Sequence, residues 1–468
     1  MATTFEHMGL TKKNLLIMAI MVFGGFITVL NVTLLTPALP SIMTEMNVSA
    51  STAQWLTTGA LMVSGIMIPI SAFLLDKFTT RKLFFFAMGL FTFGSLIVAI
   101  SSNFGIVLFG RACQAAGGGI MMPMGQVLML LILPKQYRGT GMGIIGIVFG
   151  VAPCVGPVIA GLVIDAFNWH VLFYGLVVLA LLIIILSFFV LDNFGEPKDV
   201  HLDILSVILS TLGFGGLLYS FSAIGSSGFS TSVIVSLAVG AVTLAMFIYR
   251  QLHMETPLLR MDILANRTFA ISVILTMLVN AAVIVGGILM PIYIQTIRGF
   301  SATTSSLIML PAALISAFMS PISGRLFDKY GARTLAVPGL LVTILATICL
   351  TRLNDATPLF YIGFVYCFRM FGLALVNMPL NTWGLNALDN SVMAHGTAIG
   401  NTFRNVAGSL GTAILVTVMS ISIALAPDAS SGVAQIAGIN YAFTGATIMM
   451  VIAFVLAFLF VKVEKYKQ

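Results

Sequence analysis

The sequence predicts an all-α membrane protein whose chain crosses the bilayer fourteen times. Three observations support this prediction: few residues are charged, long apolar runs recur, and basic residues are sorted between alternate loops. Of the 468 residues, 59% are hydrophobic and 8% are charged, whereas soluble domains are about 25% charged. A chain of this composition cannot cover a globule with charge, so we expect lipid around it.

Apolar runs long enough to cross a membrane recur along the whole chain. A helix needs about 20 residues to cross a hydrocarbon core of ~30 Å, and fourteen such spans can be placed. The runs are continuous rather than alternating, and open sheet edges cannot face lipid, so we expect helices and not strands. The predicted spans are residues 14–36, 54–75, 83–101, 105–133, 140–165, 170–192, 204–224, 231–250, 269–293, 304–326, 335–352, 358–388, 396–425 and 440–461.

The basic residues test this placement, because an even number of spans sorts the loops into two sets. Of the 22 Lys and Arg residues, Arg298 and Arg352 fall in one set and three fall inside spans, while all the others fall in the set that includes both termini. Cytoplasmic loops of membrane proteins are enriched in Lys and Arg, so we expect both termini in the cytoplasm. The spread of charge over many short loops also argues against a nucleic-acid partner.

Two longer loops divide the spans into groups of six, two and six. We expect an N-terminal six-helix bundle over residues 1–200, two additional helices over 201–252, and a C-terminal six-helix bundle over 253–468. The two bundles share sequence patterns: residues 71–82 (SAFLLDKFTTRK) have a counterpart in residues 323–333 (SGRLFDKYGAR). Repeated halves are typical of transporters that work by alternating access. The two additional helices lack the repeated motifs, so we expect them to be peripheral to transport.

This repeated segment is a charged turn in which an aspartate is flanked by basic residues. Glycines allow close backbone approach, and such a turn can latch two helices in one conformation and release them in another. The first copy keeps Asp76 and Arg81 but has Ala72 and Thr79 at the glycine positions. Either copy alone is compatible with an ordinary basic loop, but two copies favour a conformational switch. The switch residues of the second copy are Gly324, Asp328, Gly331 and Arg333.

The fifth span combines small residues with two prolines, in a stretch that includes Gly156, Pro157 and Gly161. Small residues let helices approach closely, and proline bends or weakens a span. Two interpretations remain open: ordinary helix packing, or a bend that seals a cavity while the two halves move.

Three arginines, Arg111, Arg369 and Arg404, fall inside predicted spans. A buried cation in lipid is expensive, so each should face a cavity, a cluster of carbonyl groups or an anion. All fifteen acidic residues fall in loops or near the ends of spans, so no carboxylate is expected beside the arginines. Either carbonyl and amide groups hold the arginines, or Arg111 or Arg369 contacts a neutral or anionic amphiphile.

Amide and hydroxyl side chains concentrate in the first, fourth, twelfth and thirteenth spans. Helix packing is one explanation, since an interhelical hydrogen bond contributes ~0.6 kcal/mol on average. Their concentration in a few spans favours a shared cavity instead. Besides the three arginines, the residues predicted to line it are Asn31, Thr33, Gln114, Gln126, Asn280, Asn377, Asn381, Trp383 and Asn401.

The sequence lacks the motifs of common catalytic and metal sites. The five histidines fall in loops or at span ends, and the four cysteines fall in apolar runs without metal-ligand spacing. Neither a Gly-x-x-x-x-Gly-Lys-Ser/Thr phosphate loop nor a His-Glu-x-x-His motif is present. We therefore expect no enzyme activity, no cofactor and no metal, and we expect a gradient to supply the energy for transport.

In its charged turns and in the motifs of its spans, the chain resembles the major facilitator superfamily, and within it the 14-span drug:proton antiporter family. Residues 324–333 are similar to the loop signature of the superfamily, and residues 111–119 to its fourth-span motif. Residues 156–161 look like the fifth-span motif of exporters. Residues 30–40 look most like the lincomycin-resistance branch of Gram-positive bacteria.

The resemblance implies a monomeric, proton-coupled exporter of small amphiphilic drugs or metabolites in the bacterial cytoplasmic membrane. Many relatives carry an aspartate where this chain has Asn31, and an amide does not exchange a proton at physiological pH. The remaining candidates for proton coupling are Asp76, Asp165 and Asp328. The alternative function is a flippase or facilitator of anionic lipids or organic anions. A receptor or membrane scaffold is disfavoured, because the chain lacks large loops that partners could bind.

Overall fold

The computed structural model describes residues 10–194, 197–227, 230–426 and 431–462. These residues are mostly helical and form no strand, and fourteen of their helices are long and apolar enough to cross a membrane. The predicted all-α fold with fourteen transmembrane helices is therefore confirmed. Many large apolar side chains on these helices face outward, such as Phe189 (79% exposed) and Phe360 (83% exposed). Such exposure is expected of a surface that lipid covers.

The N-terminal half contains six of these helices and one short helix, α3. Asn or Thr side chains cap several of their first turns, as where Thr79 accepts a hydrogen bond from the backbone N–H of Lys82 and Asn103 from that of Ile106. The elements are α2 (Lys12–Met46), α3 (Ala50–Ala53), α4 (Trp55–Lys77), α5 (Thr80–Ile100), α6 (Phe104–Ile132), α7 (Arg138–Ala166) and α8 (Trp169–Val190).

Helix α2 extends ten residues beyond the predicted span 14–36, through Pro37 and Pro40. Neighbouring helices can satisfy the backbone groups that proline frees, so proline does not have to end a membrane helix. The helix ends instead at Asn47, whose φ of 50° is left-handed and whose backbone N–H donates to the carbonyl of Met43.

The C-terminal half contains the other six-helix bundle. A π-helical segment, Ile292–Ile297, follows Pro291 and extends the first of its helices, and such segments often interrupt helices at functional positions. The helices are α11 (Arg267–Pro291), α12 (Ala302–Tyr330), α13 (Ala332–Leu350), α14 (Leu359–Asn386), α15 (Met393–Ala424) and α16 (Gly432–Phe460).

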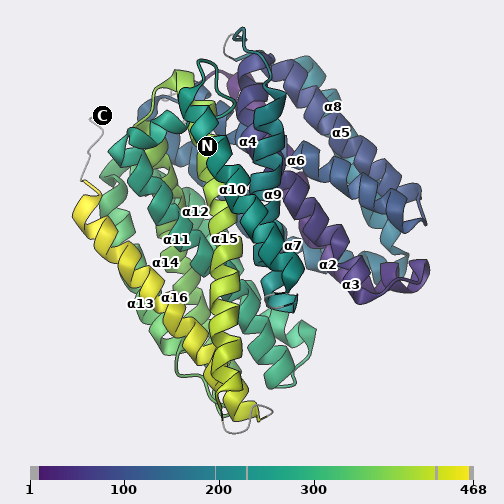
Figure 1. Ribbon diagram of the computed structural model, residues 1–468, viewed down its shortest axis with the longest axis vertical. Coiled ribbons are helices and arrows are strands. Elements are labelled where there is room, and N and C mark those ends of the chain that lie inside the picture. The colour runs from purple at the N-terminus through teal and green to yellow at the C-terminus, as the bar shows by residue number, and fades with distance from the viewer. Residues whose placement is uncertain (1–9, 195–196, 228–229, 427–430, 463–468) are drawn as a thin grey trace.

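Helices α9 (Ile204–Ser227) and α10 (Thr231–His253) form a hairpin that lies in front of the boundary between the halves in Figure 1. Gly216 and Gly240 let their backbones approach closely. Helix α9 packs against both α4 of the N-terminal half and α15 of the C-terminal half. The ring of Tyr219 stacks on that of Trp55, with the ring centroids 6.1 Å apart. The hairpin is therefore in contact with both halves.

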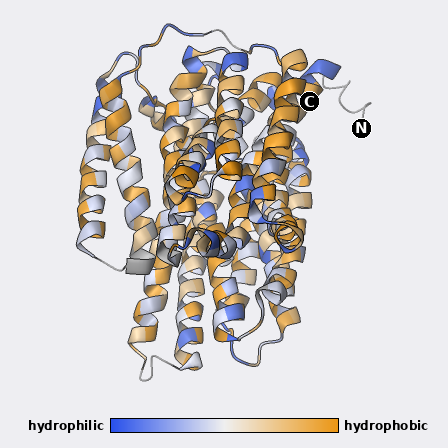
Figure 2. Cartoon of the chain, turned by 90° about the vertical axis from the view of Figure 1, so that its right-hand side faces the viewer, coloured by the Kyte–Doolittle hydropathy of each residue, from blue (hydrophilic) through white to orange (hydrophobic). Residues whose placement is uncertain are grey.

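The two halves meet through α7 with α12 and through α4 with α15. The backbones of α7 and α12 approach closely: a Cβ atom at Gly143 would lie 2.6 Å from the carbonyl oxygen of Ser320, and one at Gly150 would lie 2.7 Å from the Cα of Ala317. Figure 2 shows hydrophobic residues along most of the helix lengths, with hydrophilic residues more frequent near the end where the termini lie.

A candidate substrate cavity between the two halves

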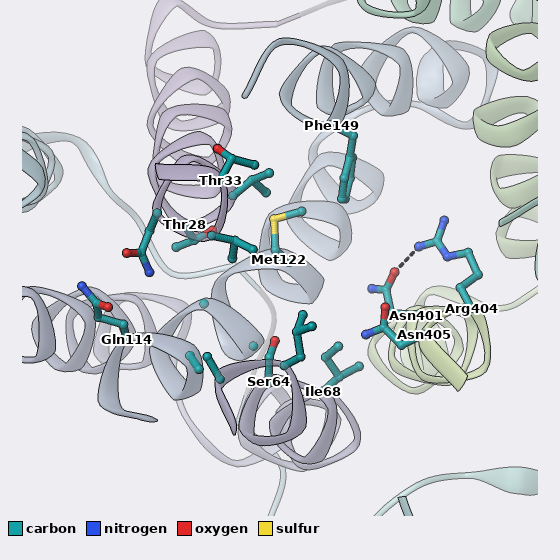
Figure 3. Close-up of a pocket in the computed structure, with 18 of the residues that line it drawn as sticks. Thr28, Thr33, Ser64, Ile68, Gln114, Met122, Phe149, Asn401, Arg404 and Asn405 are labelled. Carbon is teal, nitrogen blue, oxygen red and sulfur yellow. Dashed lines mark hydrogen bonds between the residues drawn. The ribbon is translucent and has the colours of Figure 1, made fainter. Parts of the chain in front are cut away.

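A cavity of about 390 Å³ lies between the two halves and is lined by α2, α4, α6 and α7 from one half and by α11, α14 and α15 from the other. We call it the central cavity. Figure 3 shows side chains from both halves facing its interior, among them Thr33, Phe149 and Asn401. Its volume lies within the range of small-molecule sites. The lining residues include two arginines and no aspartate or glutamate.

Arg111 is 1% exposed and is held in the wall of the cavity by neutral acceptors. Its Nη1 donates to Asn31 Oδ1 at 2.7 Å and to Gln114 Oε1 at 2.9 Å, and its Nε donates to the carbonyl of Leu56 at 3.3 Å. Gln114 Nε2 in turn donates to the hydroxyl of Ser95 at 2.9 Å. The guanidinium is thus fixed in orientation without a carboxylate partner.

Close packing of α5 on α6 positions this group. A Cβ atom at Gly94 would lie 2.5 Å from the carbonyl oxygen of Gly110 and 2.7 Å from the backbone nitrogen of Gln114. At Gly117, a Cβ atom would lie 2.5 Å from the carbonyl oxygen of Ala87. Glycine at these positions lets the two backbones touch, which brings Ser95 within reach of Gln114.

Arg404 is the second cation of the cavity, and it comes from the opposite half. Its Nη2 donates to Asn401 Oδ1, as Figure 3 shows. Asn280 Nδ2 donates to the backbone carbonyl of Arg404 at 2.8 Å. Asn401 Nδ2 donates to Gln126 Oε1 on α6 at 3.0 Å, so an amide pair joins the halves beside the cavity.

The structure brings eight of the predicted cavity residues together and places four elsewhere. Those that line the central cavity are Asn31, Thr33, Arg111, Gln114, Asn280, Asn377, Asn401 and Arg404. Those outside its lining are Gln126, Arg369, Asn381 and Trp383. Asn381 and Trp383 are buried in α14, and Gln126 lines a much smaller pocket that shares Met122 with the cavity.

Arg369 lies inside the C-terminal half rather than in the cavity wall. The side chain is fully buried, its Nη2 donates to the carbonyl of Ala282, and its guanidinium lies 5.5 Å from the ring centroid of Tyr366. Gly286 makes room for it, because a Cβ atom there would collide with the guanidinium. In this structure the Arg369 side chain therefore does not reach the central cavity, where the predicted contact with a substrate would be made.

Several residues of the cavity wall were not predicted from the sequence. Thr28, Thr57 and Ser64 line the cavity, as do the larger side chains of Met122 and Phe149. The Thr28 hydroxyl donates to the carbonyl of Gly25 one turn earlier, at 2.8 Å. Hydroxyl residues commonly bond in this way within helices, so their presence in a span does not distinguish a cavity from a packed interface.

At one end of the cavity, the second switch motif joins the two halves. The carboxylate of Asp328 in α12 accepts hydrogen bonds from the backbone N–H groups of Gly139 and Thr140, both at 2.7 Å, and from the Thr140 hydroxyl at 2.5 Å. Gly139 and Thr140 lie in the first turn of α7, where unpaired N–H groups favour an anion. Gly324 permits this approach, because a Cβ atom there would collide with the carbonyl of Gly139.

Two other residues of this motif shape the turn after α12. Gly331 has a φ of 78°, in the left-handed region that favours glycine, and separates α12 from α13. The Arg333 guanidinium lies 5.1 Å from the ring centroid of Phe458 on α16. The motif thus combines a contact between halves with a contact inside the C-terminal half.

The first switch motif also reaches the other half. Asp76 lies 3.0 Å from His395 Nε2 on α15 and accepts a hydrogen bond from Lys198 Nζ at 2.9 Å. Lys198 donates as well to the carbonyl of Ser391 at 2.8 Å. Arg81 stays within its own half, where its Nη2 donates to the carbonyl of Phe188 at 2.8 Å. Both copies therefore place an aspartate in a contact between halves.

The fifth-span motif packs against the cavity helix α2. A Cβ atom at Gly156 would collide with Oγ1 of Thr33, whose hydroxyl proton is shared between the carbonyls of Leu30 at 2.9 Å and Ala152 at 3.2 Å. Pro157 follows inside α7. No atom lies within 4 Å of the position that a Cβ at Gly161 would occupy. Of the two glycines, only Gly156 is in a position where this structure requires a small residue.

The remaining proton-coupling candidate, Asp165, is exposed near the end of α7. A different titratable pair lies at the end of α2. Glu45 accepts a hydrogen bond from Trp169 Nε1 at 2.7 Å and lies 2.9 Å from His170 Nε2. The sequence analysis did not predict this pair, because Glu45 and His170 lie far apart in the chain. Among the described residues, no group of three or more His, Cys, Asp and Glu side chains is placed to hold a metal ion.

Comparison with known proteins identifies the family. The model of the Major Facilitator Superfamily matches residues 21–412. The chain is 42% identical to the uncharacterized MFS-type transporter YcnB of Bacillus subtilis, over 99% of this chain and 98% of that protein. It is 39% identical to the lincomycin resistance protein LmrB of Listeria monocytogenes, over 96% and 97% of the two chains.

Solved structures show the same fold at low sequence identity. The human organic anion transporter MFSD10 superposes with a TM-score of 0.67 and 14% identity, over 95% of this chain and 99% of that one. The proton:xylose symporter XylE superposes with a TM-score of 0.66, also at 14% identity, over 97% of each chain. The chain therefore belongs to the major facilitator superfamily and is a multi-pass membrane transporter, not an enzyme.

Proposed function

We propose that this protein is a secondary active exporter of small amphiphilic molecules in the bacterial cell membrane, working by alternating access and driven by protons. The observation that carries the proposal is the central cavity between the halves, with both switch motifs making contacts between halves at one end of it. Breaking those contacts would open that end, which is the movement that alternating access requires.

We call the end of the cavity at which the two switch motifs join the halves the closed end. It is proposed to face the cytoplasm, with both termini on that side. Arg138, Lys198 and Arg260 all take part in contacts there, in keeping with the enrichment of basic residues on the cytoplasmic side. The conformation described then corresponds to a state that is closed toward the cytoplasm. The name of the relative LmrB, a lincomycin resistance protein, supports export as the direction of transport.

Asp76 and Asp328 are the proposed proton-coupling residues, because protonation would change contacts that hold the halves together. Asp328 accepts three hydrogen bonds across the boundary, and a protonated carboxyl has less capacity to accept. Asp165 is exposed and is a weaker candidate. The cavity itself offers no carboxylate for this role.

Transport by the purified protein in proteoliposomes would test the proposal. Inside-out oriented protein should accumulate amphiphiles identified in an efflux screen when the lumen is more acidic than the bath. Uncouplers should abolish accumulation, and the Asp328→Asn variant should lose the dependence on the pH gradient.

Single-molecule photobleaching in the same vesicles should give one copy per particle if the monomer is the working unit.

A second candidate function is an uncoupled flippase or facilitator of anionic lipids or organic anions. It is favoured by the two arginines and by the absence of carboxylates among the cavity residues. In that case the protein would equilibrate its substrate across the membrane at the same rate with and without a pH gradient. That result, with uncouplers having no effect, would contradict proton-driven export.

A further inference from the structure

The central cavity contains two positive side chains whose partners are all neutral. We propose that its substrate is an amphiphile that carries an anionic group, such as a carboxylate or sulfonate, and that Arg111 and Arg404 bind this group. The inference rests on the proposed transport function and names the class of substrate that the same cavity takes.

The charge of Arg111 is oriented but not neutralised. Its acceptors are the side-chain oxygens of Asn31 and Gln114 and the backbone carbonyl of Leu56. Amide and carbonyl oxygens satisfy the geometry of a guanidinium, but they bring no negative charge. A buried cation without a counterion favours an anion within its reach.

The same holds for Arg404 on the other side of the cavity. Its described acceptor is the amide oxygen of Asn401, whose nitrogen is already engaged with Gln126. Arg404 is 8% exposed and lines the cavity. A guanidinium has five N–H donors in a fixed fork that matches a carboxylate or related oxyanion.

The acidic side chains within the spanning helices are engaged or placed elsewhere. Asp76 and Asp328 hold the contacts between halves at the closed end. Glu45 is bonded to Trp169 at the end of α2, and Asp165 is exposed at the end of α7. None of these four carboxylates lines the central cavity, so the positive charge of its wall is left for a ligand.

The cavity also has room for an apolar group beside the two cations. Leu61 and Ile68 of α4, Met122 of α6, Phe149 of α7 and Val283 of α11 contribute apolar surface to its wall. A ligand with an apolar body and one anionic group would satisfy both kinds of surface. Because Arg111 and Arg404 come from opposite halves, each half offers one cation to the anionic group of the ligand.

Arg369, the third arginine inside the spans, lies in different surroundings from the two cavity arginines. It is buried among residues of its own half, donates to the carbonyl of Ala282 and lies against the ring of Tyr366. It is outside the lining of the cavity. Its Nε and Nη1 have no hydrogen-bond partner among the described residues, so what separates Arg369 from the two cavity arginines is its position away from the surface that a ligand would contact.

Binding of three matched fluorescent probes would test the inference on purified protein in phosphatidylcholine nanodiscs. The probes are dansylglycine, which is anionic, dansylglycinamide, which is neutral, and dansylaminoethyl-trimethylammonium, which is cationic. The wild type should bind dansylglycine about tenfold or more tightly than either other probe, since a charge-assisted hydrogen bond contributes about this factor. Empty nanodiscs measure partition into lipid.

Variants connect this preference to the named residues. Asn31→Asp places a carboxylate on Arg111 and should weaken binding of dansylglycine about tenfold or more while strengthening that of the cation. Arg404→Gln should weaken only the anion, and Arg404→Lys should retain the preference. The matched control is Asn103→Asp at the exposed cap of α6, which makes the same chemical change away from the cavity and should alter nothing.

Three results would overturn the inference: equal or tighter binding of the cation by the wild type, no binding of any probe, or an anion affinity that neither Asn31→Asp nor Arg404→Gln changes. Transport measurements separate this inference from the function it rests on. If the probes show the expected preference but no proteoliposome transports them, the proposed function fails and the binding site stands. If the protein transports the probes without any preference for their charge, the proposed function stands and the inferred anion site fails.

Discussion

The carboxylate of Asp76 in the N-terminal half lies 3.0 Å from the imidazole Nε2 of His395 in the C-terminal half. The other ring nitrogen of His395, Nδ1, lies 3.2 Å from the backbone nitrogen of Arg260, whose N–H donates to it. Nδ1 is therefore unprotonated in this arrangement, and Nε2 carries the hydrogen that is donated to Asp76. This neutral tautomer connects α4, α15 and the segment before α11.

Replacement of His395 by alanine should weaken the closed end of the transporter. It removes the bond to Asp76 and leaves a half-buried carboxylate short of one donor, which costs about 1–3 kcal/mol, or roughly 5- to 150-fold in the ratio of closed to open molecules. Nitroxide labels at the exposed residues Lys82 and Asp389 would report the change as a second, longer distance. His253→Ala, at an exposed histidine on α10, should leave the distances unchanged, and an identical shift in both variants would refute the assignment.

Replacement of Asp328 by asparagine should have a similar effect at the other contact between halves. The amide offers one acceptor oxygen and turns its NH₂ group toward the N–H donors of Gly139 and Thr140, so at least one of three hydrogen bonds is lost. The expected cost is about 1–3 kcal/mol against the closed state. Nitroxide labels at the exposed Lys135 and Lys329 would report the larger share of open molecules as a second, longer distance.

The exposed carboxylate of Asp165 provides the matched control for this variant. Asp165→Asn makes the same chemical change at the far end of α7 and should leave the distance between Lys135 and Lys329 as in the wild type. If Asp328→Asn also left that distance unchanged, the contact at the start of α7 would not hold the closed state.

Much of the fold could be predicted from the sequence, because helix length and charge sorting depend on the bilayer and not on tertiary contacts. The end of α2 was an exception: Pro37 and Pro40 do not interrupt the helix, since its surroundings decide whether proline ends it. For the site, the sequence showed which residues are polar inside spans but not the direction in which each one faces. Arg369 and Arg404 have the same status in the sequence, and only helix rotation and packing place one in the C-terminal bundle and the other in the cavity.

Stability at low pH should depend on the ion pair at the start of α9. Arg250 Nε donates to Asp203 Oδ2 at 2.7 Å, and this hydrogen bond, assisted by Ser206, lowers the pKa of Asp203 to about 2. An unfolded aspartate has a pKa of about 3.9, so the folded state gains stability from this group at pH values above 3.9. That gain declines as the pH falls from about 4 toward 2.

Asp203→Asn should therefore lower the melting temperature at pH 7, and its difference from the wild type should shrink below about pH 4. Scanning fluorimetry between pH 7 and pH 3 measures both curves. Asp262→Asn is the control, because Asp262 and Arg260 form a pair in which both side chains are about half exposed, and exposed pairs contribute little to stability. A constant difference at every pH would mean that Asp203 stabilises the helix without its charge.

The two glycines of the fifth-span motif should respond differently to the same substitution. Gly156→Ala places a methyl group against Oγ1 of Thr33, and overpacking of this kind costs about 1–3 kcal/mol. Because Thr33 lines the cavity, the displacement of α2 from α7 should reduce transport roughly tenfold or more in the proteoliposome assay. Gly161→Ala meets no atom within 4 Å and should transport at close to the wild-type rate.

The double variant Gly156→Ala, Thr33→Ala removes the nearest colliding atom and should recover part of the lost rate. If Gly161→Ala were the more damaging of the two single variants, the motif would act through a contact made in another conformation, and the packing of Gly156 on Thr33 would not explain its role.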